Sequence, residues 1–312
     1  MKKNSKPDRQ KLPHFPFEDP PFRLSMGLLK VPQTEWFEIF DLQERAIQMA
    51  EKRKLLANNQ DDVFISDPSA IMASTEVLNL MLEYLPSIRP ELYSRGKDTI
   101  KLESHTMFDG GEWSTDLKVN KMHPLDLAAR LVQEDLVIMF PPEERKSGWW
   151  LAAGSVAFPS RWSLKEKFGQ TMDLIHAPVP SYKEQLQAPT NGFFDQMPVN
   201  EIFFRRNWSL HDNPSLRQDG TEKMSEGPRV TSVNAGEYLW LRVERQTIRK
   251  LKESGAILFT IRIHLRQLKH VVKFEGIARR LAKALSTLPP EMQTYKQTDT
   301  FADSVQDYLN QF

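Results

Sequence analysis

Residues 256–265, Ala-Ile-Leu-Phe-Thr-Ile-Arg-Ile-His-Leu, decide the fold of this 312-residue chain. Isoleucine, phenylalanine or leucine occupies every second position from 257 to 265, whereas Thr260, Arg262 and His264 point the other way. Alternation with a period of two is typical of a β-strand that turns one face to a core. We therefore expect a strand over 256–265 and a sheet around it.

Similar runs predict the rest of that sheet. We expect further strands over 149–158, 202–210 and 238–245. Apolar residues at helical spacing predict the helices, and their expected ranges are 41–56, 75–85, 124 to about 140, 164–175, 182–194 and 274–285. Asp41 and Glu44 form a capping-box pattern at the first of these helices. This order of elements predicts an α+β fold, an antiparallel sheet with helices on one face.

Proline spacing divides the chain. Six prolines before residue 33 predict an extended, proline-rich N-terminal segment over 1–33, because proline disfavours helix. The main unit is expected to be a single domain over 34–296, followed by a C-terminal tail over 297–312. We find no internal repeat.

Composition narrows the possible functions. The chain has 42 Lys and Arg against 41 Asp and Glu, a balance that argues against a broad nucleic-acid-binding surface. No run approaches the roughly 20 apolar residues that span a bilayer, and the N-terminus lacks the apolar core of a secretory signal. We expect a cytoplasmic protein that binds neither nucleic acid nor membrane.

The chain contains no cysteine, which excludes thiolate zinc sites, iron–sulfur clusters and thiolate-ligated haem on this chain. Glycine-rich nucleotide loops, the His-Glu-x-x-His motif and the Gly-x-Ser-x-Gly elbow are also missing. A standard kinase, dehydrogenase or hydrolase is therefore disfavoured. Any metal must be held by oxygen, thioether or imidazole ligands, and the chain has seven histidines.

His176 is the first candidate ligand. It lies at the end of the helix expected over 164–175, and Pro178 and Pro180 stiffen the chain after it. A histidine held in this way can point one ring nitrogen at a metal ion. The alternative is a helix-end histidine that bonds a carbonyl or complements the helix dipole. His264, among the polar positions of its strand, is the second candidate.

Charged strand residues are the next candidates. Arg206 and Trp208 share one face of a strand, where they can hold an acidic cofactor group and pack on a flat ring, or simply cover each other at the surface. Arg242, Glu244 and Arg245 lie in the most charged strand-like run. That run forms either a polar pocket wall or a solvated face of the sheet.

Several blocks in the same order resemble the haem-dependent oxidative N-demethylase family, of the dimethylamine monooxygenase haem-subunit type. These blocks are Gln133-Glu134-Asp135-Leu136, Phe158-Pro159-Ser160-Arg161-Trp162, Ile175-His176-Ala177-Pro178-Val179-Pro180, Arg206-Asn207-Trp208, residues 242–247 and residues 256–262. The resemblance covers roughly 21–296. Lys252 and His264 depart from the pattern of the family, as does the tail after Lys296.

The resemblance implies a PAS-like fold that holds haem b. It implies O2-dependent demethylation of a small secondary amine such as dimethylamine, giving formaldehyde. Electrons would come from NADPH through a partner reductase subunit that carries FMN and an iron–sulfur cluster. By the same resemblance, His176 becomes the axial iron ligand, and Arg206, Trp208, Arg242 and Arg245 become cofactor-binding residues. Glu244 becomes the catalytic candidate, which would meet the cationic amine.

Two alternatives stay open at this point. One is a haem-binding sensor or ligand-binding protein without turnover, because a fold does not fix a function. The other is a haem-free module that binds another ligand or a protein partner.

Overall fold

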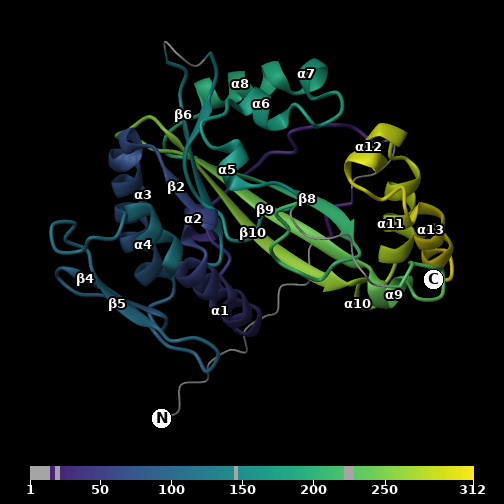
Figure 1. Ribbon diagram of the computed structural model, residues 1–312, viewed down its shortest axis with the longest axis horizontal. Helices are drawn as coiled ribbons and strands as arrows, with labels where there is room; N and C mark the ends of the chain where they lie inside the picture. Colours follow the sequence, from purple (N-terminus) through teal and green to yellow (C-terminus); the bar gives the residue numbers. More distant parts are fainter. Residues whose placement is uncertain (1–14, 18–21, 144–146, 221–227) are drawn as a thin grey trace.

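A seven-stranded, fully antiparallel sheet forms the centre of the molecule (Figure 1), in a computed structural model that describes residues 15–17, 22–143, 147–220 and 228–312. In sheet order its strands are β1 (Leu29–Val31), β8 (Ile202–His211), β9 (Trp240–Lys250), β10 (Ile257–Gln267), β6 (Asp135–Phe140), β7 (Trp150–Ser155) and β2 (Phe64–Ser66). A smaller sheet comprises β3 (Tyr93–Arg95), β4 (Thr99–Leu102) and β5 (Gly111–Ser114). The expected α+β class and antiparallel sheet are confirmed.

Helices cover both faces of the large sheet. One face lies under η1 (Gln33–Glu35), α1 (Leu42–Asn58), η2 (Pro68–Ala70), α3 (Ile71–Ile88) and α4 (Pro124–Leu131), and α2 (Gln60–Val63) lies at the β2 edge, where it contacts α1 and α5. The other lies under α5 (Leu164–Lys167), α6 (Met172–His176), α7 (Tyr182–Gln185) and α8 (Gln187–Gln196). We call these the α1 face and the α6 face. We had expected helices on one face only, and that expectation was wrong.

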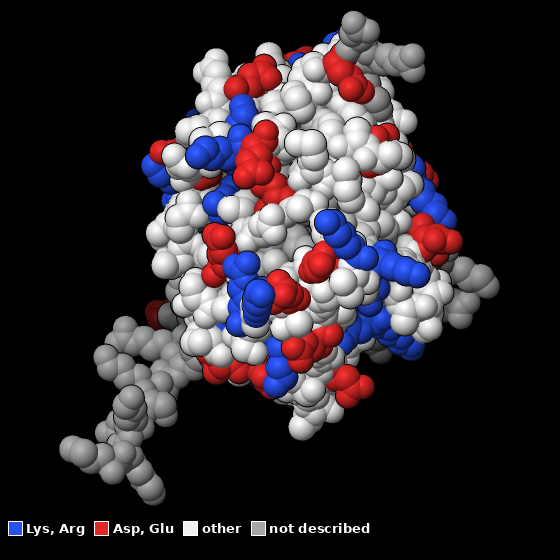
Figure 2. Space-filling view, turned by 90° about the vertical axis from the view of Figure 1, so that its left-hand side faces the viewer, with Lys and Arg blue, Asp and Glu red and all other residues white. Residues whose placement is uncertain are grey.

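The C-terminal helices pack together at the end of the sheet where β9 begins, to the right in Figure 1. They are α9 (Ala235–Tyr238), α10 (Leu268–Val271), α11 (Ile277–Ser286), α12 (Pro290–Tyr295) and α13 (Ala302–Leu309). None of the helices in the described parts of the chain is long and apolar enough to cross a bilayer. On the side of the molecule that carries α3 and the small sheet, acidic and basic side chains are intermingled (Figure 2).

Strand register decides which side chains share a face, because directly paired residues in an antiparallel sheet point the same way. Arg262 of β10 pairs with Arg245 of β9, which pairs with Arg206 of β8. All three therefore lie on the α1 face. Glu244 pairs instead with Ile263, so it lies on the α6 face.

The alternating strand over 256–265 is confirmed as β10, and the predicted runs around it form β7, β8 and β9. Asp41 caps α1 as expected, accepting the Glu44 amide at 2.9 Å. The capping box is only half formed, because the Glu44 carboxylate turns instead to Arg262 and His264.

Two helix predictions were wrong. The helix that begins at Pro124 ends at Leu131, and residues 135–140 form the buried strand β6. A short, continuous apolar run fits either structure, and pairing with β7 and β10 selects the strand. The helix expected over 164–175 is two short helices, separated at Gly169, whose φ of +74° lies in the left-handed region.

The described residues of both terminal segments join the main fold. Residues 1–14 and 18–21 of the proline-rich segment lie outside the described residues. Within the rest of that segment, β1 pairs with β8. In the 297–312 tail, α13 packs its buried Val305 and Leu309 against the core of α11.

Candidate functional site

Short local contacts fix α6, the helix that carries His176. Thr171 caps the helix, and its hydroxyl accepts the Leu174 amide at 3.4 Å. The Asp173 carboxylate accepts hydrogen bonds from Gln187 at 2.7 Å and from Asn191 at 3.1 Å. Both donors lie on α8, so these bonds tie α6 to the larger helix beside it.

The ring of His176 is held in one orientation. Its Nδ1 lies 2.8 Å from the Met172 carbonyl, and the ring stacks on Tyr182 at 4.9 Å between centroids with planes 15° apart. A carbonyl only accepts hydrogen bonds, so Nδ1 carries the proton and Nε2 carries the lone pair. Burial lowers the pKa of His176, and Arg205 adds to this effect. The neutral, oriented imidazole is the form that binds a metal ion.

Two other histidines, the half-buried His264 and the buried His211, are engaged at both nitrogens. His264 Nε2 lies 2.8 Å from Glu38, and its Nδ1 lies 3.5 Å from Glu44. Burial and Arg262 lower the pKa of His264, but the hydrogen bonds to these carboxylates outweigh them and raise it, so a carboxylate faces each ring nitrogen. His211 bonds Ser209 and Gln218, each at 2.7 Å. The geometry therefore favours His176 over His264 as a ligand.

The structure divides the predicted site residues between the two faces. Met172 and Ile175 of α6 pack in one cluster with Ile248 and Phe259, so His176 lies on the α6 face. By register, Arg242 and Glu244 share this face, as described above for Glu244. Arg206, Trp208 and Arg245 have the opposite orientation and are not brought to His176.

Glu244 and Arg242 are joined. Arg242 is fully buried, and its Nε lies 3.4 Å from the Glu244 carboxylate. Its two other nitrogens donate to the carbonyls of Leu216 at 2.8 Å and Phe158 at 2.6 Å. Gln246 donates to the second oxygen of Glu244 at 3.1 Å. Glu244 is therefore an oriented carboxylate on the α6 face, whereas Arg242 holds the backbone of two loops.

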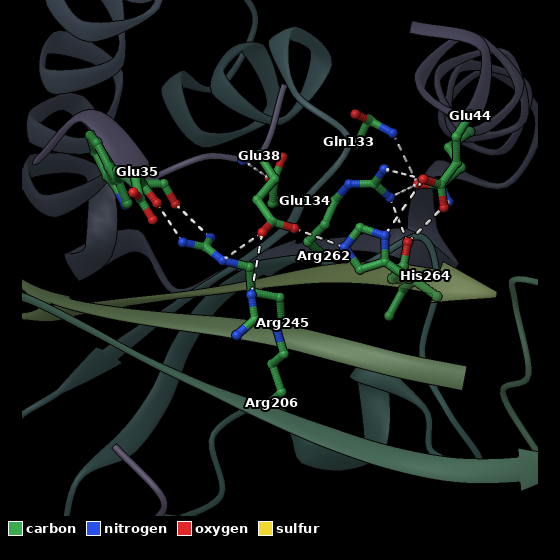
Figure 3. A network of polar contacts seen from close by, with 12 residues as sticks. Glu35, Glu38, Glu44, Gln133, Glu134, Arg206, Arg245, Arg262 and His264 are labelled. Atoms are coloured by element: carbon green, nitrogen blue, oxygen red, sulfur yellow. Dashed lines mark hydrogen bonds and ion pairs between the residues drawn. The ribbon is translucent and has the colours of Figure 1, made fainter. Parts of the chain in front are cut away.

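A charge network occupies the α1 face (Figure 3). Glu38 lies within 2.8 Å of His264, 3.2 Å of Arg245 and 3.6 Å of Arg206. Arg245 also donates to the carbonyls of Trp36 and Glu35. Burial alone would raise the pKa of Glu38, but these cations lower it to about 2. The acidic group that Arg206 pairs with is therefore Glu38 of the same chain, and not an acidic group of a cofactor.

Glu44 completes this network from α1. Its carboxylate lies 3.2 Å from Arg262, and Arg262 and His264 lower its pKa to about 2 despite burial. Gln48 and Gln133 continue the chain of hydrogen bonds behind Arg262. Trp208 lies outside the network, edge-on to Phe17 with ring centroids 5.1 Å apart.

Sequence reasoning missed three polar residues that lie on the α6 face or beside Glu244. Arg205 pairs with Gln246 in the sheet and so lies on the α6 face. Tyr295, at the end of α12, has its pKa raised by burial and by Glu244. Arg161 donates to the Lys296 carbonyl at 2.5 Å, just beyond Tyr295. The alternation of β8 indicates only that Arg205 and Arg206 point to opposite faces, and its register with β9 assigns Arg205 to the α6 face.

A cleft of about 640 Å³ opens along β8. Residues of the N-terminal segment, β8 and α11 line it, among them Phe17, Met26, Arg205, Arg206 and Ile277. The charge of Arg205 also lowers the pKa of His176, so Arg205 lies between this cleft and the surroundings of α6.

These features define a protein with an antiparallel sheet covered by helices and, on its α6 face, a histidine whose Nδ1 is bonded to a carbonyl. Among the described residues, no group of three or more His, Asp or Glu side chains is placed to form an all-protein metal site. A haem needs only an axial ligand from the protein, so one histidine of this kind fits it.

The family described as haem-dependent oxidative N-demethylase, alpha subunit-like, matches residues 27–306. The chain belongs to this family. The family is haem-dependent and oxidative, and its description as an alpha subunit indicates an assembly with more than one kind of subunit.

Proposed function

We propose that the protein removes a methyl group from a small secondary amine such as dimethylamine, using O2 and a haem b held by His176. The observation that carries the proposal is the His176 ring, with its Nδ1 proton on the Met172 carbonyl and its Nε2 lone pair directed away from it. Bound haem would supply the activation of O2 and the oxidation of the N-methyl group, releasing formaldehyde.

We describe the fold as PAS-like, and the strand order supports this description. The β6–β7 hairpin is followed by α5 to α8, which cross one face of the sheet. The meander of β8, β9 and β10 then brings β10 back beside β6. A ligand between this sheet and the crossing helices would lie on the α6 face, where His176 and Glu244 lie.

Glu244 and Arg205 of the α6 face have separate roles in this proposal. Glu244, held by Arg242 and Gln246, is the catalytic candidate: its carboxylate would accept the N–H of a cationic amine and orient its methyl group. Arg205 is the guanidinium that we assign to the acidic groups of the cofactor. Arg206 and Arg245 would support the strands from the α1 face through Glu38.

Electrons would reach the site from outside. The chain has no cysteine for an iron–sulfur cluster and no glycine-rich dinucleotide motif. We therefore propose a partner reductase subunit that carries NADPH, FMN and an iron–sulfur cluster, in keeping with the alpha-subunit description. We propose a cytoplasmic location and no nucleic-acid or membrane partner.

A haem titration tests the proposal. The purified chain is mixed with hemin and the Soret absorption is recorded for the wild type, His176→Ala and the matched control His264→Ala. We expect a Soret band that His176→Ala abolishes or shifts and that His264→Ala retains. An unchanged band in His176→Ala would reject this ligand, and no band in the wild type would reject haem binding.

Substrate and turnover need a second measurement. Dimethylamine added to the haem protein should shift the Soret band, and with a chemical reductant and O2 it should yield formaldehyde. Glu244→Gln should weaken the amine-induced shift while haem stays bound. A spectral response without formaldehyde would support the alternative, a haem-binding sensor or ligand-binding protein.

A further inference from the structure

The peptide of Phe158 is held from both sides by buried polar side chains. Asp135 accepts the Ala157 amide at 2.8 Å and the Phe158 amide at 2.9 Å. Arg242 donates to the Phe158 carbonyl at 2.6 Å. Asp135 and Arg242 are both 0 % exposed, so water does not compete with either side chain for these bonds.

The same guanidinium joins this turn to a second loop. A second nitrogen of Arg242 donates to the Leu216 carbonyl at 2.8 Å. The loop also forms backbone hydrogen bonds with the turn. The backbone amide of Gln218 donates to the Pro159 carbonyl at 3.0 Å, and the backbone amide of Arg161 donates to the Gln218 carbonyl at 2.5 Å. One side chain therefore fixes the spacing of two loops that are about 60 residues apart in sequence.

Arg161, in the same turn, has an unusual backbone conformation and bonds to the end of α12. Its φ of 63° lies in the left-handed region, which costs a non-glycine residue about 1 kcal/mol or more. Its side chain donates to the Lys296 carbonyl at 2.5 Å. The turn thus connects the sheet to the end of α12, beside Tyr295.

Both loops cover the α6 face. Phe158 and Leu216 pack in one buried cluster with Ile261 and Ile263 of β10. Trp162, which follows Arg161, packs against both this cluster and the one that contains α6. The position of the two loops therefore sets the shape of the face on which His176 lies.

We propose that Arg242 and Asp135 are positioning residues that hold the turn 157–162 and the loop 213–218 as one wall of the cofactor site. Arg242 does not touch the cofactor and acts through the two carbonyls that it fixes. This inference rests on the proposed function only in naming what the wall encloses. A guanidinium suits the task because its planar fork reaches two carbonyls and a carboxylate together, which an ammonium group does not.

Arg242→Lys tests the inference, with Arg249→Lys as its control. Arg249 lies on the same strand but on the α1 face, with its guanidinium 4.4 Å from the Trp36 ring. Amide hydrogen exchange is measured on both haem-free variants. In Arg242→Lys we expect the Arg161 and Gln218 amides to exchange about tenfold faster or more, and in Arg249→Lys we expect wild-type rates.

The wall should also govern haem affinity. We expect Arg242→Lys to weaken haem binding by about 10- to 100-fold, the usual effect of losing support behind a ligand site, with the Soret maximum unchanged because His176 remains. Asp135→Asn, which conserves volume, is the second variant, and it should speed exchange of the Ala157 and Phe158 amides.

The outcomes separate the two proposals. Wild-type exchange and affinity in Arg242→Lys and Asp135→Asn would overturn the positioning role. Faster exchange without any loss of haem affinity would overturn the assignment of this wall to the cofactor site. If the wild type binds no haem but amide exchange still rises in Arg242→Lys, the positioning role of Arg242 is supported and the haem proposal fails. Should Arg242→Lys not fold, Asp135→Asn decides in the same way.

Discussion

Replacing Glu38 with glutamine should destabilise the fold strongly. Glu38 faces His264, Arg245 and Arg206 on the α1 face, and its side chain is 13 % exposed. Glutamine keeps the shape of the side chain but removes its charge. The three cations then lose the carboxylate that they share, in a place where water reaches them poorly.

The magnitude follows from the pKa. The cations lower the pKa of Glu38 from 4.5 to about 2, and each unit corresponds to about 1.4 kcal/mol. The charged form of Glu38 is thus favoured by about 3 kcal/mol in the fold. Breaking a buried ion pair typically costs about 3–5 kcal/mol. We expect a value near 3 because His264 can release its proton once Glu38 is neutral.

The pH dependence gives the sign of the effect. Because the pKa of Glu38 is lower in the folded chain, its contribution is complete above about pH 4.5 and is lost as the pH falls towards 2. The difference between wild type and Glu38→Gln should therefore shrink over that range. The pKa of His264 is raised, so its contribution is complete below its ordinary value and is lost as the pH rises through the raised one.

Urea unfolding followed by tryptophan fluorescence measures both effects, at pH 7 and at steps between pH 5 and 2.5. Glu237→Gln is the matched control: Glu237 pairs with Lys269 at the surface and is 56 % exposed, so its loss should change the free energy of unfolding by about 0.5 kcal/mol or less. A Glu38→Gln variant within about 1 kcal/mol of wild type at pH 7 would refute the reasoning. So would a difference that persists at pH 2.5.

Three further predictions concern the framework. Gly110→Ala should destabilise the fold by about 2 kcal/mol or more, because the new Cβ would lie 2.2 Å from the Leu102 carbonyl oxygen. Gly192→Ala has open space in α8 and should stabilise the fold by about 0.5–1 kcal/mol. Thermal unfolding should give a lower melting temperature than wild type for Gly110→Ala and a higher one for Gly192→Ala. Leu258→Ala should cost about 2–5 kcal/mol in urea unfolding, since this side chain is fully buried, and a loss below 1 kcal/mol would contradict that packing. Asp41→Ala should cost about 1 kcal/mol by removing the α1 cap; amide exchange at the start of α1 should rise with it.

Sequence pattern predicted the strands better than their surroundings. The alternation over 256–265 identified β10 and the side chains that share each of its faces, because a two-residue alternation follows from the geometry of a single strand. It could not show that the polar side of β10 is covered by α1. Nor could it separate the buried strand β6 from a continuation of α4, because both are short apolar runs.

The candidate site was only partly predictable for the same reason. His176 was found from its place before two prolines, and the structure adds the bond to Met172 that orients its ring. Whether Arg205 or Arg206 faces His176 depends on the register of β8 with β9, which no local pattern fixes. The partners of Arg242 lie in loops 26 and 84 residues away, so its anchoring role is visible only in three dimensions.

The charge network of the α1 face has a consequence for how the chain folds. Glu38 and His264 are 226 residues apart in sequence, and Arg245 and Trp36 are 209 apart. During synthesis the N-terminal carboxylates leave the ribosome long before their cationic partners, so this side of the core cannot close until most of the chain has emerged. Folding that depends on such distant contacts is slow and exposes apolar strands meanwhile. Efficient production of this protein should therefore depend on chaperones that shield β6 and β7 until β8, β9 and β10 arrive.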